Sequence, residues 1–197
     1  MDLTKILPVI GMSLCAMTSF SQTLLPIAVP ESKWINSYFE EVKRYDSNDD
    51  AKTLKTAKQL VAAQEFCILA EDSLINNKAF LKMDDCSGTY IGSVRDDQGK
   101  LMFVPRNSTT ESVVYDFTAS KGDVIKSVLS RDLSGTYQHT NVVVTSVDSV
   151  SIAGCDRKRI NFDGGSWVEG IGNEHGLFMS QSTSYKGYFK DLTCMCN

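Results

Sequence analysis

The sequence has no cluster of basic residues and little excess of either charge. Its 20 Lys and Arg residues are outnumbered by 24 Asp and Glu, which gives a net charge of −4 over 197 residues. A nucleic-acid-binding protein needs a Lys- and Arg-rich face to neutralise phosphates. We therefore expect no nucleic-acid partner. The ordinary apolar content, 42%, is typical of a globular chain with a core of its own.

Beyond its first 21 residues the chain also lacks any apolar run of 18 residues, so no transmembrane segment is expected in the mature chain. The beginning itself is apolar from Ile6 to Phe20, after a single Lys5. Ser19 and Ser21 place small residues at the −3 and −1 positions of a cleavage site. Residues 1–21 are therefore predicted to be a signal peptide, with a buried N-terminal helix as the alternative. The expected location is the periplasm, the outer-membrane periphery or the extracellular space.

Histidine is scarce, with two residues, and the mature chain holds an odd number of cysteines. The pair near the C-terminus is separated by one residue, a spacing that fits neither a zinc knuckle nor a thioredoxin-like site. We expect no metal and no cofactor. Export permits disulfides, and two bridges with one cysteine left over can be arranged in 15 ways. The candidate disulfide cysteines are Cys67, Cys86, Cys155, Cys194 and Cys196.

Alternation between strand-like and helix-like segments is absent from the second half of the chain, which excludes a parallel α/β sheet. Short β-rich runs recur there at about ten-residue spacing, separated by turn signals such as Asn76-Asn77 and the DDQG of residues 96–99. The pattern predicts an all-β protein, an antiparallel meander that forms a barrel or a sandwich. We expect residues 22–33 to be an extended lead-in and residues 34–197 to be a single β-rich domain.

The segment from residue 34 to 64 is ambiguous. Trp34, Tyr38 and Val42 fit one face of a helix and equally one face of a strand. The following stretch, AKTLKTAKQLVAAQ, is rich in Ala and Lys, and Asp49 or Asp50 could cap a helix there. Local propensity therefore predicts a short helix around residues 50–63.

A glycine-rich segment, GGSWVEGIGNEHGLF, spans residues 164–178. It does not match the dinucleotide fingerprint, because the last gap is one residue too long and no helix follows. Glu169 and His175 could exchange protons, but the sequence supplies no nucleophile or stabilising donors beside them. The best interpretation is a strand that ends in a tight turn, in which a bulge, positive φ or close packing requires three glycines. These are Gly170, Gly172 and Gly176.

Several segments follow one another in a recognisable order: YIGSVRDDQGKLMFVP, VVYDFTASKGDVI and WVEGIGNEHGLF. The series, over roughly residues 65–195, resembles a group of uncharacterised secreted proteins of Bacteroidetes-type bacteria, many of which continue into a type IX secretion sorting domain. The W-x-E-G-I-G element is the most specific part of the match. The resemblance implies export and a β-rich module, and it brings no catalytic residues with it.

These observations favour an exported, non-enzymatic β-module that binds a small molecule, a glycan or an envelope protein. The aromatic and polar side chains expected to line such a site are Trp34, Tyr90, Trp167, Glu169 and His175. An alternative is an envelope hydrolase of glycans, in which Glu169 works with Asp163 or Asp116, because such enzymes pair two carboxylates across a cleft. A structural or adhesin subunit with an open strand edge is the third hypothesis.

Overall fold

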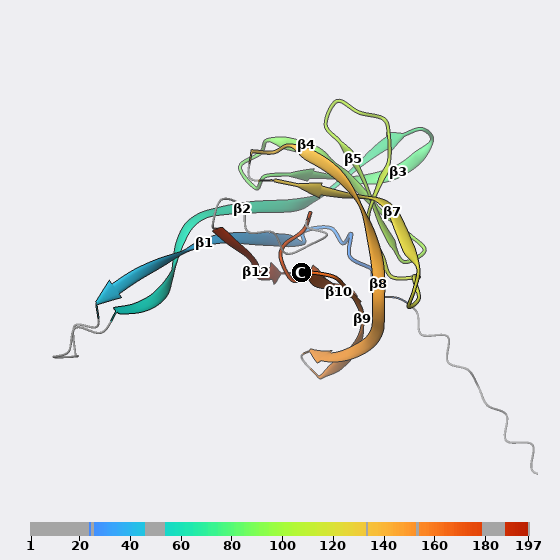
Figure 1. Ribbon diagram of the computed structural model, residues 1–197. Helices are drawn as coiled ribbons and strands as arrows, with labels where there is room; N and C mark the ends of the chain where they lie inside the picture. The colour runs from blue at the N-terminus through green and yellow to red at the C-terminus, as the bar shows by residue number, and fades with distance from the viewer. Residues whose placement is uncertain are drawn as a thin grey trace, which may run out of the picture.

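A computed structural model confirms the all-β class and shows two curled antiparallel sheets (Figure 1). No helix in the part of the chain that the structure describes is long and apolar enough to cross a membrane. The described residues are Leu24, 26–45, 54–132, 134–152, 154–178 and 188–196. The predicted signal peptide lies outside them.

The first sheet has seven strands in the order β12-β1-β2-β3-β4-β5-β6. Six of them follow one another along the chain as the predicted meander, and the last strand of the protein returns to pair with the first. The strands are β1 (Lys33–Tyr45), β2 (Leu54–Ile75), β3 (Lys78–Asp84), β4 (Tyr90–Asp97), β5 (Lys100–Pro105), β6 (Ser112–Asp116) and β12 (Tyr188–Cys196).

The second sheet has five strands in the order β11-β10-β9-β8-β7 and is again a meander. Its long strands curl so that its inner face turns toward the first sheet (Figure 1). The strands are β7 (Val124–Arg131), β8 (Tyr137–Ile152), β9 (Cys155–Phe162), β10 (Gly165–Val168) and β11 (Gly172–Asn173).

The predicted hairpin turns are confirmed, and their backbone angles explain the residues found there. Asn76 and Asn77 both have positive φ, 50° and 61°, between β2 and β3. Gln98 and Gly99 have φ of 51° and 90° between β4 and β5. Two positive φ angles in a two-residue loop define the type I′ turn, whose twist matches that of the flanking strands.

The helix predicted around residues 50–63 is wrong where the structure describes it, because β2 begins at Leu54. β1 and β2 pair in antiparallel register from Lys33↔Cys67 to Tyr45↔Leu54, with a bulge opposite Tyr38 and Phe39. Each residue of this pairing gains ladder hydrogen bonds and a cross-strand neighbour, which outweigh the small intrinsic helix preference of Ala and Lys. Residues 34–45, which fitted both periodicities, are likewise strand.

The far end of the β1–β2 hairpin extends away from the rest of the protein as a two-stranded ribbon (Figure 1). We call this ribbon, residues 39–45 of β1 and 54–62 of β2, the arm. Among the described strands, β12 pairs with β1 only from Lys33 to Glu40, so beyond Glu40 the arm has no third strand. Leu54, Leu60 and Val61 are 46%, 55% and 39% exposed on it.

The segment before β1 packs onto the first sheet rather than leading away from it. Ile27 is buried, and the main-chain N–H of Ala28 donates to a carboxylate oxygen of Asp96 at 2.8 Å. Glu31 and Ser32 exchange backbone hydrogen bonds with Ile68. Burial raises the pKa of Asp96, although the hydrogen bond from Ala28 opposes this. The domain boundary at residue 34 stays a prediction, and β1 begins one residue earlier.

One turn occurs twice in the structure. Residues 85–90 and 132–137 both read D-x-S-G-T-Y, and each stretch joins two neighbouring strands, β3 to β4 and β7 to β8. Both glycines have positive φ, 95° at Gly88 and 88° at Gly135. In each turn the first Asp accepts a main-chain N–H from the Thr four residues later, at 2.9 Å. The same six-residue pattern therefore forms the same hydrogen-bonded turn twice, once in each sheet.

The turn carboxylates should make the protein sensitive to acid. Hydrogen bonds from Ser87, led by its hydroxyl group at 2.7 Å, and from Thr89 lower the pKa of Asp85 to about 2. An unfolded chain has an Asp pKa of about 3.9. A carboxyl whose pKa is depressed by folding stabilises the folded state above the unfolded pKa, and this stabilisation is lost as pH falls from about 4 to about 2.

We therefore expect Asp85→Asn to lower the free energy of unfolding at pH 7 and to have a smaller effect at pH 2.5, measured by urea denaturation. Asp132→Asn should also lower the free energy of unfolding more at pH 7 than at pH 2.5, because the hydroxyl group of Ser134 lowers the pKa of Asp132. Ser87→Ala removes one hydrogen-bond donor and keeps the carboxyl group of Asp85. It should reduce the difference between the free energies of unfolding at pH 7 and at pH 2.5. An equal loss at both pH values would contradict this account.

Candidate functional site

The glycine-rich segment forms the last short hairpin of the second sheet. β10 ends at Val168, and a three-residue turn leads to β11. The turn is closed by a hydrogen bond of 3.0 Å from the N–H of Ile171 to the carbonyl of Val168. Gly170 has a φ of 71° within it. The expected tight turn is therefore present, with Gly170 at its centre rather than in a strand.

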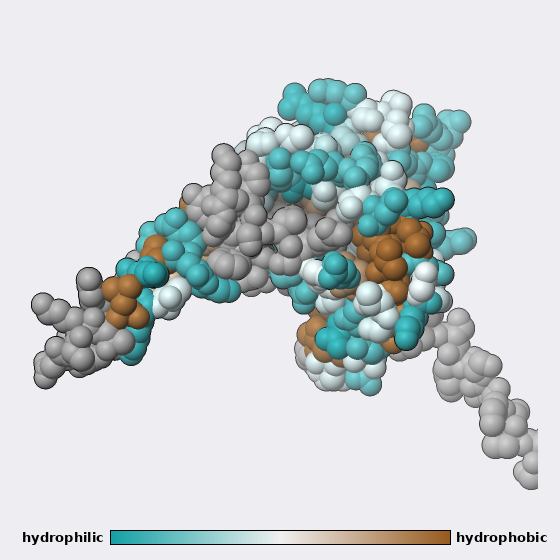
Figure 2. Space-filling view, viewed as in Figure 1, coloured by the Kyte–Doolittle hydropathy of each residue, from teal (hydrophilic) through white to brown (hydrophobic). Residues whose placement is uncertain are grey.

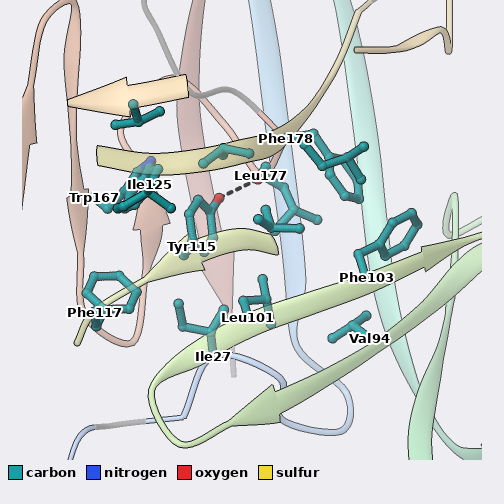
Figure 3. Packing of buried hydrophobic residues seen from close by; sticks show 14 of the residues in the cluster. Ile27, Val94, Leu101, Phe103, Tyr115, Phe117, Ile125, Trp167, Leu177 and Phe178 are labelled. Carbon is teal, nitrogen blue, oxygen red and sulfur yellow. Dashed lines mark hydrogen bonds between the residues drawn. The ribbon is translucent and has the colours of Figure 1, made fainter. Parts of the chain in front are cut away.

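Trp167, the first of the expected binding residues, lies in the core. Its side chain is 0% exposed and packs against Tyr115 of β6 and Phe162 of β9, with ring centroids 5.5 and 5.1 Å apart. Figure 3 shows it among other buried side chains of the cluster. Trp34 is also 0% exposed, and its indole N–H donates to the carbonyl of Ile171 at 3.0 Å. Both tryptophans thus hold the glycine-rich segment in place.

Glu169 is buried, 3% exposed, although it lies in a turn. Its carboxylate accepts the main-chain N–H of Lys158 at 3.0 Å, and its own N–H donates to the carbonyl of Lys158. Its carbonyl accepts Nη1 of Arg157 at 3.2 Å. The side chain therefore continues the pairing of β9 beyond the end of β10. This is a structural use of a carboxylate, in which a buried polar group satisfies a backbone donor.

The other two motif glycines allow close packing. A Cβ on Gly172 would lie 2.9 Å from the hydroxyl oxygen of Tyr115, and a Cβ on Gly176 only 2.3 Å from Oδ1 of Asn36. Their φ angles are 107° and 100°. Both reasons expected for glycine at these positions, positive φ and close approach, are confirmed.

After Gly176 the chain enters the space between the two sheets. The N–H of Leu177 donates to Oδ1 of Asn36 at 3.1 Å, and the hydroxyl group of Tyr115 donates to the carbonyl of Leu177, as the dashed line in Figure 3 marks. The Phe178 ring then meets three aromatic rings from both sheets. Their centroids lie 5.3, 4.8 and 6.0 Å from it, in Phe66, Phe103 and Tyr137. Burial raises the pKa of Tyr115, which keeps its hydroxyl group protonated as a donor.

The remaining candidates do not join this cluster. His175 is partly buried, and its Nε2 lies 3.4 Å from a carboxylate oxygen of the adjacent Glu174. Tyr90 is 37% exposed at the start of β4, where its hydroxyl group is 2.8 Å from that of Ser93. The expected site residues are therefore divided: two tryptophans and Glu169 in the interior, and Tyr90 on the surface.

The carboxylates of the hydrolase alternative are engaged in structural contacts. Asp116 forms an ion pair of 2.8 Å with Lys100 and accepts the N–H of Thr118 at 2.9 Å. Burial by itself raises the pKa of Asp116, but the hydrogen bonds from Lys100 and Thr118 outweigh burial and hold this pKa below its usual value. Asp163 is exposed, whereas Glu169 is buried on the main chain of β9. The structure therefore supplies no reason to assign an acid and a base among the three.

One disulfide joins Cys67 of β2 to Cys86 of the first D-x-S-G-T-Y turn, and the Cys155 thiol is free and exposed. Asp84 lies close to the two bonded sulfurs, and the three groups could form a metal ligand set only if the bridge were reduced. Cys194 and Cys196 lie in β12, opposite Ile35 and Lys33 of β1. Their side chains lie outside the part of the chain that the structure describes.

No family model, curated protein or solved structure matches the chain. The resemblance to secreted proteins of Bacteroidetes-type bacteria therefore stays a prediction from the sequence.

Proposed function

We propose that this protein is an exported, non-enzymatic module of the cell envelope that binds a protein partner through the arm. The observation that carries the proposal is the arm itself: a two-stranded ribbon that leaves the body and exposes Leu54, Leu60 and Val61. An isolated two-stranded hairpin is marginally stable in water, and exposed apolar side chains on it favour contact with another surface. Export rests on the predicted signal peptide and on the family resemblance.

The partner-binding version is favoured over a carrier of small apolar molecules because of what fills the interior. The space between the sheets is occupied by a buried cluster that includes Trp34, Tyr115, Trp167 and Phe178. A small β-barrel holds a ligand when side chains leave room for one, and this interior is packed with aromatic rings from both sheets (Figure 3). Binding is then a property of the surface, on which Figure 2 shows apolar groups both on the arm and, over a larger area, on the body.

A photo-cross-linking amino acid at Leu60, introduced in the cell that makes the protein, tests the proposal. We expect one discrete covalent adduct, because the side chain of Leu60 is 55% exposed on the arm. The same probe at Ser108, which is exposed in the polar loop between β5 and β6, is the control and should give none. Equal labelling from both positions, or none from either, would refute the arm as a binding surface. Recovery of the protein in the cytoplasmic fraction would refute export.

A further inference from the structure

The disulfide between Cys67 and Cys86 has a buried carboxylate beside it. Asp84 is 8% exposed, and one of its carboxylate oxygens and the two sulfurs all lie within 4.8 Å of one another. Neither cysteine is fully buried, so a dissolved thiol or phosphine can reach the bridge. Two sulfurs and one oxygen this close together become a set of metal ligands when the sulfurs are separate thiolates.

The main chain holds these three residues together independently of the S–S bond. Cys67 of β2 lies directly opposite Asp84 of β3 in the antiparallel ladder. The N–H of Cys86 donates to Oδ1 of Asp84 at 2.8 Å, and the N–H of Asp85 donates to the carbonyl of Thr89 at 3.1 Å to close the turn. Reduction of the bridge breaks none of these contacts, so the three ligand residues stay in place.

The repeated D-x-S-G-T-Y turn shows that neither Asp84 nor Cys86 is needed to form the turn. In the second copy, Arg131 and Leu133 occupy the equivalent positions in the sequence. The hydrogen bond between the first Asp and the Thr has the same length, 2.9 Å, in both copies. The carboxylate and the sulfur are therefore additions to the first turn, and they lie where Cys67 can join them.

The spacing of the two cysteines suits a tetrahedral metal ion. Zinc binds thiolates at about 2.3 Å, which places two thiolate sulfurs about 3.8 Å apart. The Cα atoms of Cys67 and Cys86 are 5.1 Å apart, so rotation about the Cα–Cβ bonds brings the separated sulfurs to that distance. The carboxylate of Asp84 is the third ligand, and three protein ligands leave a fourth position for water. Thiolate donors favour zinc-like ions over magnesium or calcium.

We propose that the reduced protein binds one zinc-like divalent cation between the thiolates of Cys67 and Cys86 and the carboxylate of Asp84. The disulfide and the metal ion exclude each other, because a sulfur of an intact bridge is not a thiolate ligand. The site thus exists in one redox state of the protein and is closed in the other. This inference is independent of the arm and of the partner proposed for it.

The exchange between the two states is a two-electron step. A dithiol reduces the bridge to two thiols and is itself oxidised to a disulfide, and the metal ion then displaces the two thiol protons. In the reverse direction, oxidised glutathione takes two electrons from the thiolates. One S–S bond forms between Cys67 and Cys86, the S–S bond of glutathione breaks, its two sulfurs take up two protons, and the metal ion is released.

Titration with Co²⁺ tests the site, because thiolate ligands give cobalt a charge-transfer absorption in the near ultraviolet. The sample is the mature chain with Cys155, Cys194 and Cys196 replaced by serine, so that Cys67 and Cys86 are its only cysteines. After reduction by a phosphine without oxygen, we expect one Co²⁺ per chain and the charge-transfer band. The oxidised sample should bind Co²⁺ about 100-fold more weakly or not at all, since it has no thiolate.

Two single substitutions separate ligation from attraction by charge. Asp84→Asn keeps a side-chain oxygen that can accept the N–H of Cys86 and removes the carboxylate. It should raise the dissociation constant of Co²⁺ about tenfold or more. Glu65→Gln removes the same charge two residues from Cys67, at a side chain that is 41% exposed and pairs with Lys33. It should change the dissociation constant by less than about twofold, because water and salt screen an exposed charge.

Circular dichroism of the same samples controls for folding. We expect the β-sheet spectrum to survive reduction, and refolding of a reduced chain by Co²⁺ or Zn²⁺ would equally support the site. A reduced chain that unfolds and is not restored by either ion overturns the inference. So does the absence of the charge-transfer band, or an equal effect of Asp84→Asn and Glu65→Gln. Finally, oxidised glutathione should release the bound Co²⁺ to a coloured chelator as the bridge forms, and retention of Co²⁺ by the bridged chain would refute the exclusion.

Discussion

Replacement of Trp167 by alanine is expected to lower the free energy of unfolding by about 3–5 kcal/mol. The side chain is fully buried between Tyr115 and Phe162, so its removal leaves a large cavity and takes away the aromatic contacts that join β10 to β6 and β9. Urea denaturation followed by circular dichroism measures the change.

Trp167→Phe is the matched variant for this prediction. It keeps an aromatic ring and removes the indole N–H, which is buried and has no hydrogen-bond partner among the residues that the structure describes. A buried donor without a partner costs free energy, so its removal offsets part of the lost packing. We expect Trp167→Phe to lose less than half as much stability as Trp167→Ala. A loss below about 1 kcal/mol for alanine would instead indicate that Trp167 lines an open cavity, as a ligand carrier requires.

Gly176→Ala is expected to cost about 3 kcal/mol or more. The added methyl group would lie 2.3 Å from Oδ1 of Asn36, the atom that accepts the N–H of Leu177. It would also sit at a φ of 100°, which side chains rarely adopt and which costs about 1–3 kcal/mol. The strain and the clash together should displace the chain just before Leu177 and Phe178 enter the core.

Gly122→Ala separates the two contributions to this loss. Gly122 has nearly the same φ, 93°, but a Cβ there would meet nothing within 4 Å. Its replacement therefore reports the backbone strain alone, and the difference between the two variants reports the contact with Asn36. Equal losses for Gly122→Ala and Gly176→Ala, in the same urea titration, would show that the close approach to Asn36 contributes nothing.

Hairpins were predictable from the sequence because their turns depend on a few residues that tolerate positive φ. Asn76-Asn77 and Gln98-Gly99 place such residues between two apolar runs, and the local signal agrees with the final structure. The repeated D-x-S-G-T-Y turn was equally visible as a short internal repeat. The alternation of apolar and polar residues does not reveal such a repeat, because the repeat lies in the turns between the strands.

The helix around residues 50–63 was predicted wrongly because local propensity takes no account of β1, the strand that pairs with this segment. Ala57 and Lys58 favour helix by themselves, and only their pairing with Val42 and Glu41 makes them strand. A helix propensity of about a few tenths of a kcal/mol per residue is smaller than the free energy gained by pairing in a long antiparallel sheet. The ambiguity of Trp34, Tyr38 and Val42 had the same origin.

Side-chain roles at the glycine-rich segment were harder to predict than its turn. A Glu in a turn usually faces solvent, yet Glu169 is buried because its carboxylate accepts the main-chain N–H of Lys158 beyond the end of β10. The partner of Cys67 could not be chosen among 15 arrangements, since disulfide pairing depends on which turns meet in space.

The core of this protein joins the two ends of its chain, and this determines the order in which the molecule can be assembled. Asn36 accepts the N–H of Leu177, and Trp34 donates to Ile171, across sequence separations of 141 and 137 residues. Contacts this distant fold slowly, because a long loop must close before they form. The contacts of Trp34 and Asn36 with residues 171–177 are therefore expected to form later than the local pairing of β1 with β2. Under the proposed export, this order would keep the interior from closing around Trp34 and Asn36 before residues 171–178 have crossed the membrane.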